Sequence, residues 1–147
     1  LPPGAIHDSN RHALAALLAG LGCAVTDLGI LPDDRAAIAK ALAGAAGRHH
    51  LLLTTGGVSV GEADHVKAVM EDTGAVDFWR VAIKPGKPLA FGRVGETPLI
   101  GLPGNPVGAV VTFLIVARPY VLALMGRDPA PPVQGQAPRV PARPAGN

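Results

Sequence analysis

The chain has 147 residues, of which 48% are hydrophobic and 16% charged, so it can bury one domain-sized core and is too apolar to be disordered. Its 13 basic and 11 acidic residues give a formal net charge of +2. Arg139 and Arg143 lie in residues 129–147, which contain no acidic residue, so residues 1–128 carry 11 charges of each sign. This balance argues against a nucleic-acid partner.

A single cysteine, Cys23, excludes an internal disulfide and indicates a reducing compartment. The first ten residues, LPPGAIHDSN, contain neither the basic nor the apolar stretch of a secretory signal, so we expect a cytoplasmic location. The longest apolar run, Val107–Ala117, has 11 residues and precedes Arg118 and Pro119. A run of this length is too short to cross a bilayer, so we expect a buried helix and no membrane partner.

The first half of the chain alternates helices and strands. The predicted elements are, in chain order, a helix ended by Gly22, a strand over 23–28 (CAVTDL), a helix ended by Gly47 and a strand over 50–55 (HLLLTT). Ser9 or Asn10 can cap the first helix, and Asp33 or Asp34 can cap the second. The apolar strand over 50–55 is typical of a parallel strand that helices cover on both faces.

The second half keeps this alternation and then adds a hairpin. The predicted elements are a helix over 63–73, a strand over 76–83, hairpin strands over 88–94 and 98–102, and a helix from Pro106. We expect the last helix to pack on the sheet through Val107, Val110, Val111, Leu114 and Ile115, and Pro119 to kink it.

These elements predict a three-layer α/β/α sandwich with a mostly parallel sheet and one antiparallel hairpin strand. We expect residues 1–128 to form this domain. Residues 129–147 contain six prolines without apolar periodicity, which predicts a linker and the truncated start of a further β domain.

Strand directions place four loops at the carboxyl edge of the sheet, where ligands bind in open α/β folds. One is TTGGVSVG (54–61), whose glycines and following helix are typical of a phosphate cradle, although an ordinary tight connection is an equally frequent explanation of such glycines. Glu62 and Asp64 follow it, and carboxylates beside a phosphate favour a bridging Mg²⁺.

Two other loops at this edge also contain residues typical of anion-binding loops, although their signal is weaker. KPGKP places Lys84 and Lys87 on a rigid turn, where a solvated surface turn is the alternative. In LPGNPVG, Asn105 is a helix cap and Pro106 the first helical residue, so ligand contacts there would come from the backbone and Asn105. The histidines show no zinc spacing.

Five segments together resemble the molybdopterin molybdenumtransferase family, of the MoeA and gephyrin E-domain type. They are IHDSNR (6–11), LGILPDD (28–34), TTGGVSVGEADHVK (54–67), FWRVAIKPGKPLAFG (78–92) and GLPGNPVGAVVTF (101–113). The resemblance implies a MogA-like fold and an enzyme that inserts molybdate into adenylylated molybdopterin with Mg²⁺-dependent release of AMP. It also implies a longer protein, with a strand upstream of Leu1, further domains and a homodimeric state.

The resemblance further assigns site residues by their place in these segments. The catalytic residues it implies are Asp34, Asp64, Lys84 and Lys87. The residues it implies for cofactor binding are Gly56, Gly57, Ser59, Gly61, Lys67, Pro103, Asn105 and Pro106. The metal ligands it implies are Asp8, Asp34, Glu62 and Asp64.

Two alternatives stay open. A molybdopterin adenylyltransferase of the MogA and MoaB type would use the same cradle and acids, although that branch resembles GGTG-like loops rather than GGVSVGEAD. A scaffold domain would keep the fold without catalysis, although a scaffold has no need to concentrate acids and lysines at one edge.

Overall fold

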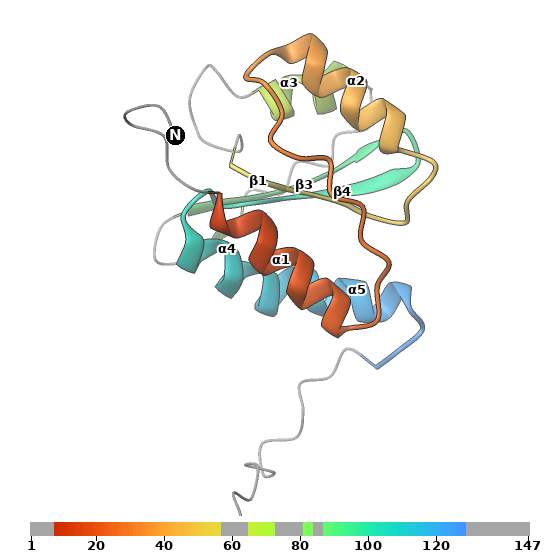
Figure 1. Ribbon diagram of the computed structural model, residues 1–147, viewed down its shortest axis with the longest axis vertical. Helices are drawn as coiled ribbons and strands as arrows, with labels where there is room; N and C mark the ends of the chain where they lie inside the picture. The colour runs from red at the N-terminus through yellow and green to blue at the C-terminus, as the bar shows by residue number, and fades with distance from the viewer. Residues whose placement is uncertain (1–7, 57–64, 73–80, 84–86, 129–147) are drawn as a thin grey trace, which may run out of the picture.

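A computed structural model describes residues 8–56, 65–72, 81–83 and 87–128, and the elements are labelled in Figure 1. The helices are α1 (Ser9–Gly20), α2 (Arg35–Ala45), α3 (His65–Asp72), α4 (Pro106–Thr112), the π-helix η1 (Phe113–Ala117) and α5 (Arg118–Leu124). The strands are β1 (Leu52–Thr55), β2 (Val81–Ile83), β3 (Lys87–Val94) and β4 (Thr97–Leu102). The predicted linker 129–147 lies outside the described residues.

The sheet has the strand order β1-β4-β3-β2. β1 and β4 are parallel, and β3 is antiparallel to both of its neighbours. The directions predicted from the sequence are therefore confirmed for these four strands, and the carboxyl ends of β1 and β4 share one edge. Lys87, which the sequence predicted to lie in a turn, already belongs to β3 and pairs with Ile83.

Helices cover both faces of the sheet, which confirms the three-layer α/β/α sandwich (Figure 1). α2 and α3 lie on one face, where Leu42, Met70 and Leu99 belong to one buried cluster. α1, α4, η1 and α5 lie on the other face, where Leu14 and Phe113 belong to a second cluster. On the first face, a Cβ added to Gly92 of β3 would lie 2.0 Å from the Met70 Cε, so the glycine lets α3 approach the sheet.

The expected strand over 23–28 is not formed. This segment is an extended coil, and within the described residues no backbone hydrogen bond joins it to a neighbouring strand. Its apolar side chains stay exposed, with 40% of Val25 and 44% of Leu28 accessible. A strand needs a ladder partner as well as β propensity, and none of the described strands lies beside this segment.

The caps of α1 and α2 are acidic. Asp8 caps α1 by accepting a hydrogen bond from the Arg11 N–H at 3.3 Å, so the expected cap at Ser9 or Asn10 is wrong by one or two residues. Both of those residues are helical instead. Asp34 caps α2, accepting from the Ala37 N–H at 2.8 Å, which decides between the two candidates at that helix.

The last helix runs without a break from residue 106 to residue 124, longer than the predicted apolar run. A stretch of 18 of its 19 residues has a mean hydropathy of 2.0, enough by length and composition alone to cross a membrane, and 33% of that stretch is buried in the domain. Pro119 lacks an N–H and crowds the carbonyl four residues earlier, which accounts for the π-helical turn of η1.

The face of this helix that packs on the sheet differs from the expectation. Ala109, Phe113 and Ala117 are buried, whereas Val107 is 72% and Ile115 is 60% exposed. Apolar residues surround the whole helix, so periodicity alone could not select its inner side. The two alanines do so because their small side chains let the backbone come close to the sheet.

Candidate functional site

The loops that follow β1 and β4 touch at the carboxyl edge of the sheet. The Gly56 N–H donates to the Leu102 carbonyl at 3.0 Å. A Cβ built on Gly104 would lie 3.5 Å from the Gly56 Cα, and Gly56 has a φ of +75° that a side chain would strain. The structure therefore places the start of TTGGVSVG against the centre of LPGNP. Both loops lie at the edge of the sheet that the strand directions predicted.

Helix α1 begins at the same edge. The buried Asn10 donates from its Nδ2 to the Gly104 carbonyl at 2.8 Å, although 94 residues separate them. Its Oδ1 is buried and has no hydrogen-bond partner within the described structure. Sequence reasoning considered Asn10 only as a cap, because nothing local indicates a partner so distant in the chain.

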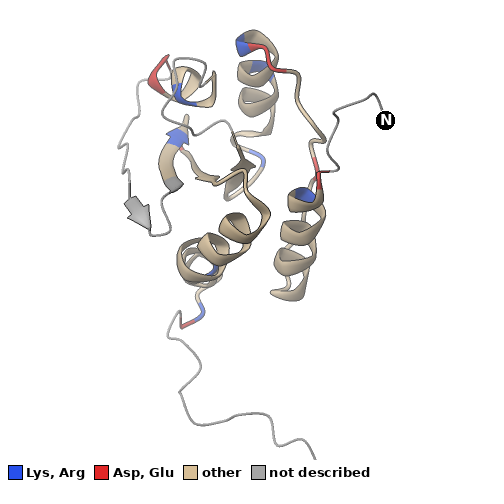
Figure 2. Cartoon of the chain, turned by 90° about the vertical axis from the view of Figure 1, so that its left-hand side faces the viewer, with Lys and Arg blue, Asp and Glu red and all other residues tan. Residues whose placement is uncertain are grey.

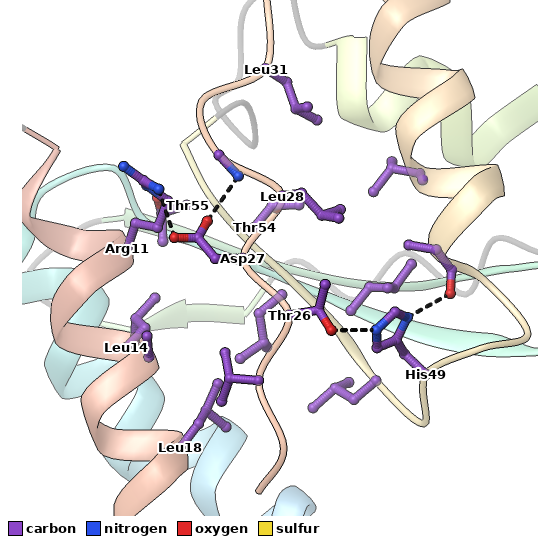
Figure 3. Close-up of a pocket in the computed structure, with 18 of the residues that line it drawn as sticks. Arg11, Leu14, Leu18, Thr26, Asp27, Leu28, Leu31, His49, Thr54 and Thr55 are labelled. Atoms are coloured by element: carbon purple, nitrogen blue, oxygen red, sulfur yellow. Dashed lines mark hydrogen bonds and ion pairs between the residues drawn. The ribbon is translucent and has the colours of Figure 1, made fainter.

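Arg11 and Asp27 form an ion pair beside this edge that the sequence did not indicate (Figure 3). The Arg11 Nη1 lies 2.6 Å from the Asp27 Oδ2, and the Arg11 Nε lies 3.4 Å from the Asp8 Oδ2. The Gly29 N–H donates to the other Asp27 oxygen at 2.8 Å. This backbone hydrogen bond first, and the guanidinium of Arg11 second, hold the pKa of Asp27 below its usual value.

The acids of α2 differ in their surroundings. Figure 2 looks onto this edge and shows acidic residues at the amino-terminal ends of α1 and α2. One oxygen of Asp34 is used by the cap, and the other makes no hydrogen bond within the described residues. The Asp33 side chain is 89% exposed and lies 3.4 Å from the His65 Nε2. Of Asp33 and Asp34, the second is therefore held in a more defined position at this edge of the sheet.

The LPGNP loop is rigid for local reasons. Pro103 is buried, and the Asn105 side chain caps α4 by accepting from the Gly108 N–H at 3.1 Å. A Cβ on Gly108 would lie 3.3 Å from the Pro103 Cβ, so the helix start packs closely on the loop. Pro106 is exposed at the first turn of the helix. The helix start expected from the sequence is confirmed.

The remaining predicted site residues are only partly covered. Lys67 lies on α3 with its Nζ 3.6 Å from a Glu71 oxygen. Lys87 begins β3. The others lie outside the described residues, namely Gly57, Ser59, Gly61, Glu62, Asp64 and Lys84. Across the described ranges no three acidic, histidine or cysteine side chains converge in a way that could hold a metal ion.

His49, at the opposite edge of the sheet, makes two ordinary hydrogen bonds, as expected. His49 pairs through Nδ1 with the Ala45 carbonyl at 2.8 Å and through Nε2 with the Thr26 hydroxyl at 3.0 Å (Figure 3). Through these two bonds His49 links Thr26 of the 23–31 segment to Ala45, the last residue of α2. The Sγ of Cys23 lies 3.9 Å from the Met125 Sδ, which fits the packing role predicted for it.

Comparison with known proteins identifies the family of the chain. Residues 1–123 match the family described as "probable molybdopterin binding domain". The chain is 50% identical over 127 residues to the molybdopterin molybdenumtransferase of Haemophilus influenzae, covering 86% of this chain and 31% of that protein. It therefore spans about a third of the length of this curated relative.

Two solved structures share the fold. The molybdopterin biosynthesis MoeA protein of Pyrococcus horikoshii matches with a TM-score of 0.72 and 28% identity, over 87% of this chain and 33% of that one. The molybdopterin biosynthesis enzyme MoaB of Thermus thermophilus matches with a TM-score of 0.61, over 85% of this chain and 89% of that one. At 22% identity, the second likeness concerns the fold alone.

Proposed function

Because the chain belongs to the family of probable molybdopterin-binding domains, we propose that it is the substrate-binding domain of a molybdopterin molybdenumtransferase. In the proposed reaction, molybdate is inserted into adenylylated molybdopterin, and water hydrolyses the phosphoanhydride bond so that the pterin keeps its phosphate and AMP is released. The enzyme is proposed to work in the cytoplasm, as a dimer in its full-length form.

The observation that carries this proposal is the contact between Gly56 and Gly104 at the carboxyl edge of β1 and β4. It joins the loop whose N–H groups suit a phosphate to the loop that starts α4. The Asn10 side chain holds the second loop by donating a hydrogen bond to the Gly104 carbonyl. A ligand with a phosphate at one end and an oxyanion at the other matches two anion-binding loops in contact.

We assign the phosphate of the pterin to the glycine-rich loop and molybdate to the loop after β4. The first assignment uses the backbone of Gly56, Gly57, Ser59 and Gly61. The second uses Pro103, Asn105 and Pro106, with the positive end of α4 facing the oxyanion. Lys67, Lys84 and Lys87 would neutralise the charge that the two anions bring together.

Asp34 and Asp64 are proposed as the acids of the reaction. The free oxygen of Asp34 can accept a proton or orient a water molecule, because the cap holds the carboxylate in one place. Mg²⁺ would supply Lewis-acid stabilisation of the leaving phosphate. Asp8 and Asp34 each have one oxygen engaged in a cap, so the described acids do not form a metal site alone, and the ion would depend on Glu62 and Asp64.

The adenylyltransferase alternative is less well supported. Its likeness rests on the fold, at 22% identity to the MoaB structure. The molybdenumtransferase relative is 50% identical over 127 residues, which are 86% of this chain. The two activities use different substrates, so incubation with molybdopterin plus ATP, against adenylylated molybdopterin plus molybdate, separates them.

The test is release of AMP from adenylylated molybdopterin by the full-length protein, with and without molybdate and Mg²⁺. We expect Asp64→Asn to abolish metal-dependent release while the circular dichroism spectrum stays unchanged. Glu96→Gln is the matched control, because this exposed acid lies in the turn before β4, at the opposite edge of the sheet. Unchanged Mg²⁺-dependent AMP release by the Asp64 variant would refute the proposal.

A further inference from the structure

Asn10 joins the start of α1 to the loop after β4. Only 7% of this polar residue is accessible, and its Nδ2 donates a hydrogen bond to the Gly104 carbonyl at 2.8 Å. Gly104 lies two residues before α4, and α1 and α4 lie side by side on the same face of the sheet (Figure 1). Since Asp8 caps α1, the Asn10 side chain is not needed for that purpose. Its long-range hydrogen bond therefore calls for an explanation of its own.

The Asn10 amide can take only one orientation. The Gly104 carbonyl accepts hydrogen bonds, so the NH2 group must face it, because a reversed amide would bring two acceptor oxygens together. The other end of the amide, Oδ1, is buried and has no hydrogen-bond partner among the described residues. A buried acceptor without a partner lowers stability, which an apolar side chain of the same shape would avoid. Stability alone is therefore a weak reason for an asparagine at this position.

The hydrogen bond from Asn10 fixes the direction of the peptide group between Gly104 and Asn105. In a planar trans peptide, the C=O and the following N–H point in opposite directions. Because the Gly104 carbonyl points toward the buried Asn10, the Asn105 N–H points away from the interior, and both loop residues are exposed. This N–H makes no hydrogen bond to a described residue. It is therefore a donor directed outward at the carboxyl edge of the sheet.

The LPGNP loop has few N–H groups that it can offer to a ligand. Pro103 and Pro106 have none. Within the described residues, the N–H groups of Gly104 and Asn105 are not engaged by the backbone, and the second belongs to the peptide group that Asn10 holds. The direction of this one donor therefore has a large share in how well the loop can bind an anion.

We infer that Asn10 is a positioning residue for the oxyanion, because it directs the Asn105 N–H toward the place where the oxyanion binds. The inference rests on the proposed function, which puts molybdate at the loop after β4. A donor that is already oriented loses little freedom on binding, and hydrogen bonds to charged groups are stronger than those between neutral groups. Without Asn10, the exposed Gly104 carbonyl can turn toward water, and the Asn105 N–H turns with it.

The test is the steady-state kinetics of AMP release by the full-length protein, with molybdate and adenylylated molybdopterin varied in turn. Asn10→Leu removes the donor and the unpaired acceptor but keeps the branched shape of the side chain. We expect KM for molybdate to rise at least about tenfold, and KM for adenylylated molybdopterin to change less than about twofold. The melting temperature should change little. Asn10→Ala, which adds no bulk, should show the same difference between the two KM values.

Leu14→Ala is the matched control, because this buried residue lies one turn further along α1 in the cluster with Phe113. The substitution loosens the packing of α1 without removing the hydrogen bond to Gly104. We expect it to lower the melting temperature and to leave KM for molybdate within about twofold of the wild-type value. A measurement on the wild-type protein needs no variant: the Asn105 amide proton resonance should shift and saturate on titration with molybdate.

The possible results separate the inference from the proposed function. If the wild-type protein responds to molybdate but both Asn10 variants keep its KM, the inference is overturned and the proposed function stands. Equal rises in both KM values, or a rise for Leu14→Ala as large as for the Asn10 variants, overturn it too, because a general loosening of α1 is then sufficient. So does an Asn105 amide that molybdate leaves unshifted. A wild-type protein that releases no AMP in response to molybdate overturns both.

Discussion

Asp34 combines two roles that one pair of substitutions can separate. Its Oδ2 accepts the Ala37 N–H at 2.8 Å from a cap residue with extended φ and ψ of −138° and 125°. Asp34→Ala removes this bond and the favourable charge at the start of α2, which together cost about 1–2 kcal/mol. For a chain of this size that corresponds to a fall in melting temperature of roughly 4–8 °C.

Asp34→Asn keeps the capping oxygen and loses only the charge. We expect it to cost about 0.5 kcal/mol, no more than half of the alanine effect. If the carboxylate takes part in the reaction as proposed, AMP release falls by about 100-fold or more in both variants, because an amide cannot replace a general base. The asparagine variant should therefore lose most of its activity while it loses little stability.

The measurements are thermal denaturation by circular dichroism and AMP release by the full-length protein. Asp33→Ala is the matched control for stability, because the Asp33 side chain is 89% exposed and its ion pair within the described residues is a 3.4 Å approach to His65. We expect its melting temperature to change by less than about 1 °C. An asparagine variant as unstable as the alanine variant would refute the cap, and one with full activity would refute the catalytic assignment.

Three further predictions test packing and charge. Gly92→Ala places a methyl group 2.0 Å from the Met70 Cε in a filled core, so we expect a loss of about 1–3 kcal/mol in urea unfolding, and a much smaller loss when the same substitution is made in a Met70→Ala background. Phe113→Ala should cost about 3–5 kcal/mol and the exposed Ile115→Ala less than about 1 in the same assay; the reverse order would contradict the inner face of the helix. The pKa of Asp27 is lower in the folded than in the unfolded chain, so its ionised form stabilises the fold at pH values above the unfolded pKa, and this stabilisation is lost as the pH falls through the folded pKa. The Asp27 carboxyl resonance should therefore titrate at a lower pH than that of a model peptide. Asp27→Asn should weaken the pH dependence of stability in that acidic range.

Local patterns in the sequence were sufficient for most helices and for the strand directions. The leucine spacing before Gly22, the Asn-Pro pair at 105–106 and the buried face of α3 each depend on residues within one or two turns. Because these signals act over short distances, they determine the elements without knowledge of the fold. The edge of the sheet at which the glycine-rich loops lie could also be predicted from the sequence, because it follows from counting strand directions.

Tertiary structure decided the features that need a second element. CAVTDL has the composition of a strand but forms no ladder in the described structure, because pairing requires a neighbour. The helix over 106–124 is apolar all round, so only packing against the sheet selects Phe113 rather than Ile115 as a core residue. Asn10 meets Gly104 across 94 residues, a contact that only the folded chain creates. Short-range propensity thus specified the parts, and long-range packing and hydrogen bonding determined which of their surfaces form the core and the candidate site.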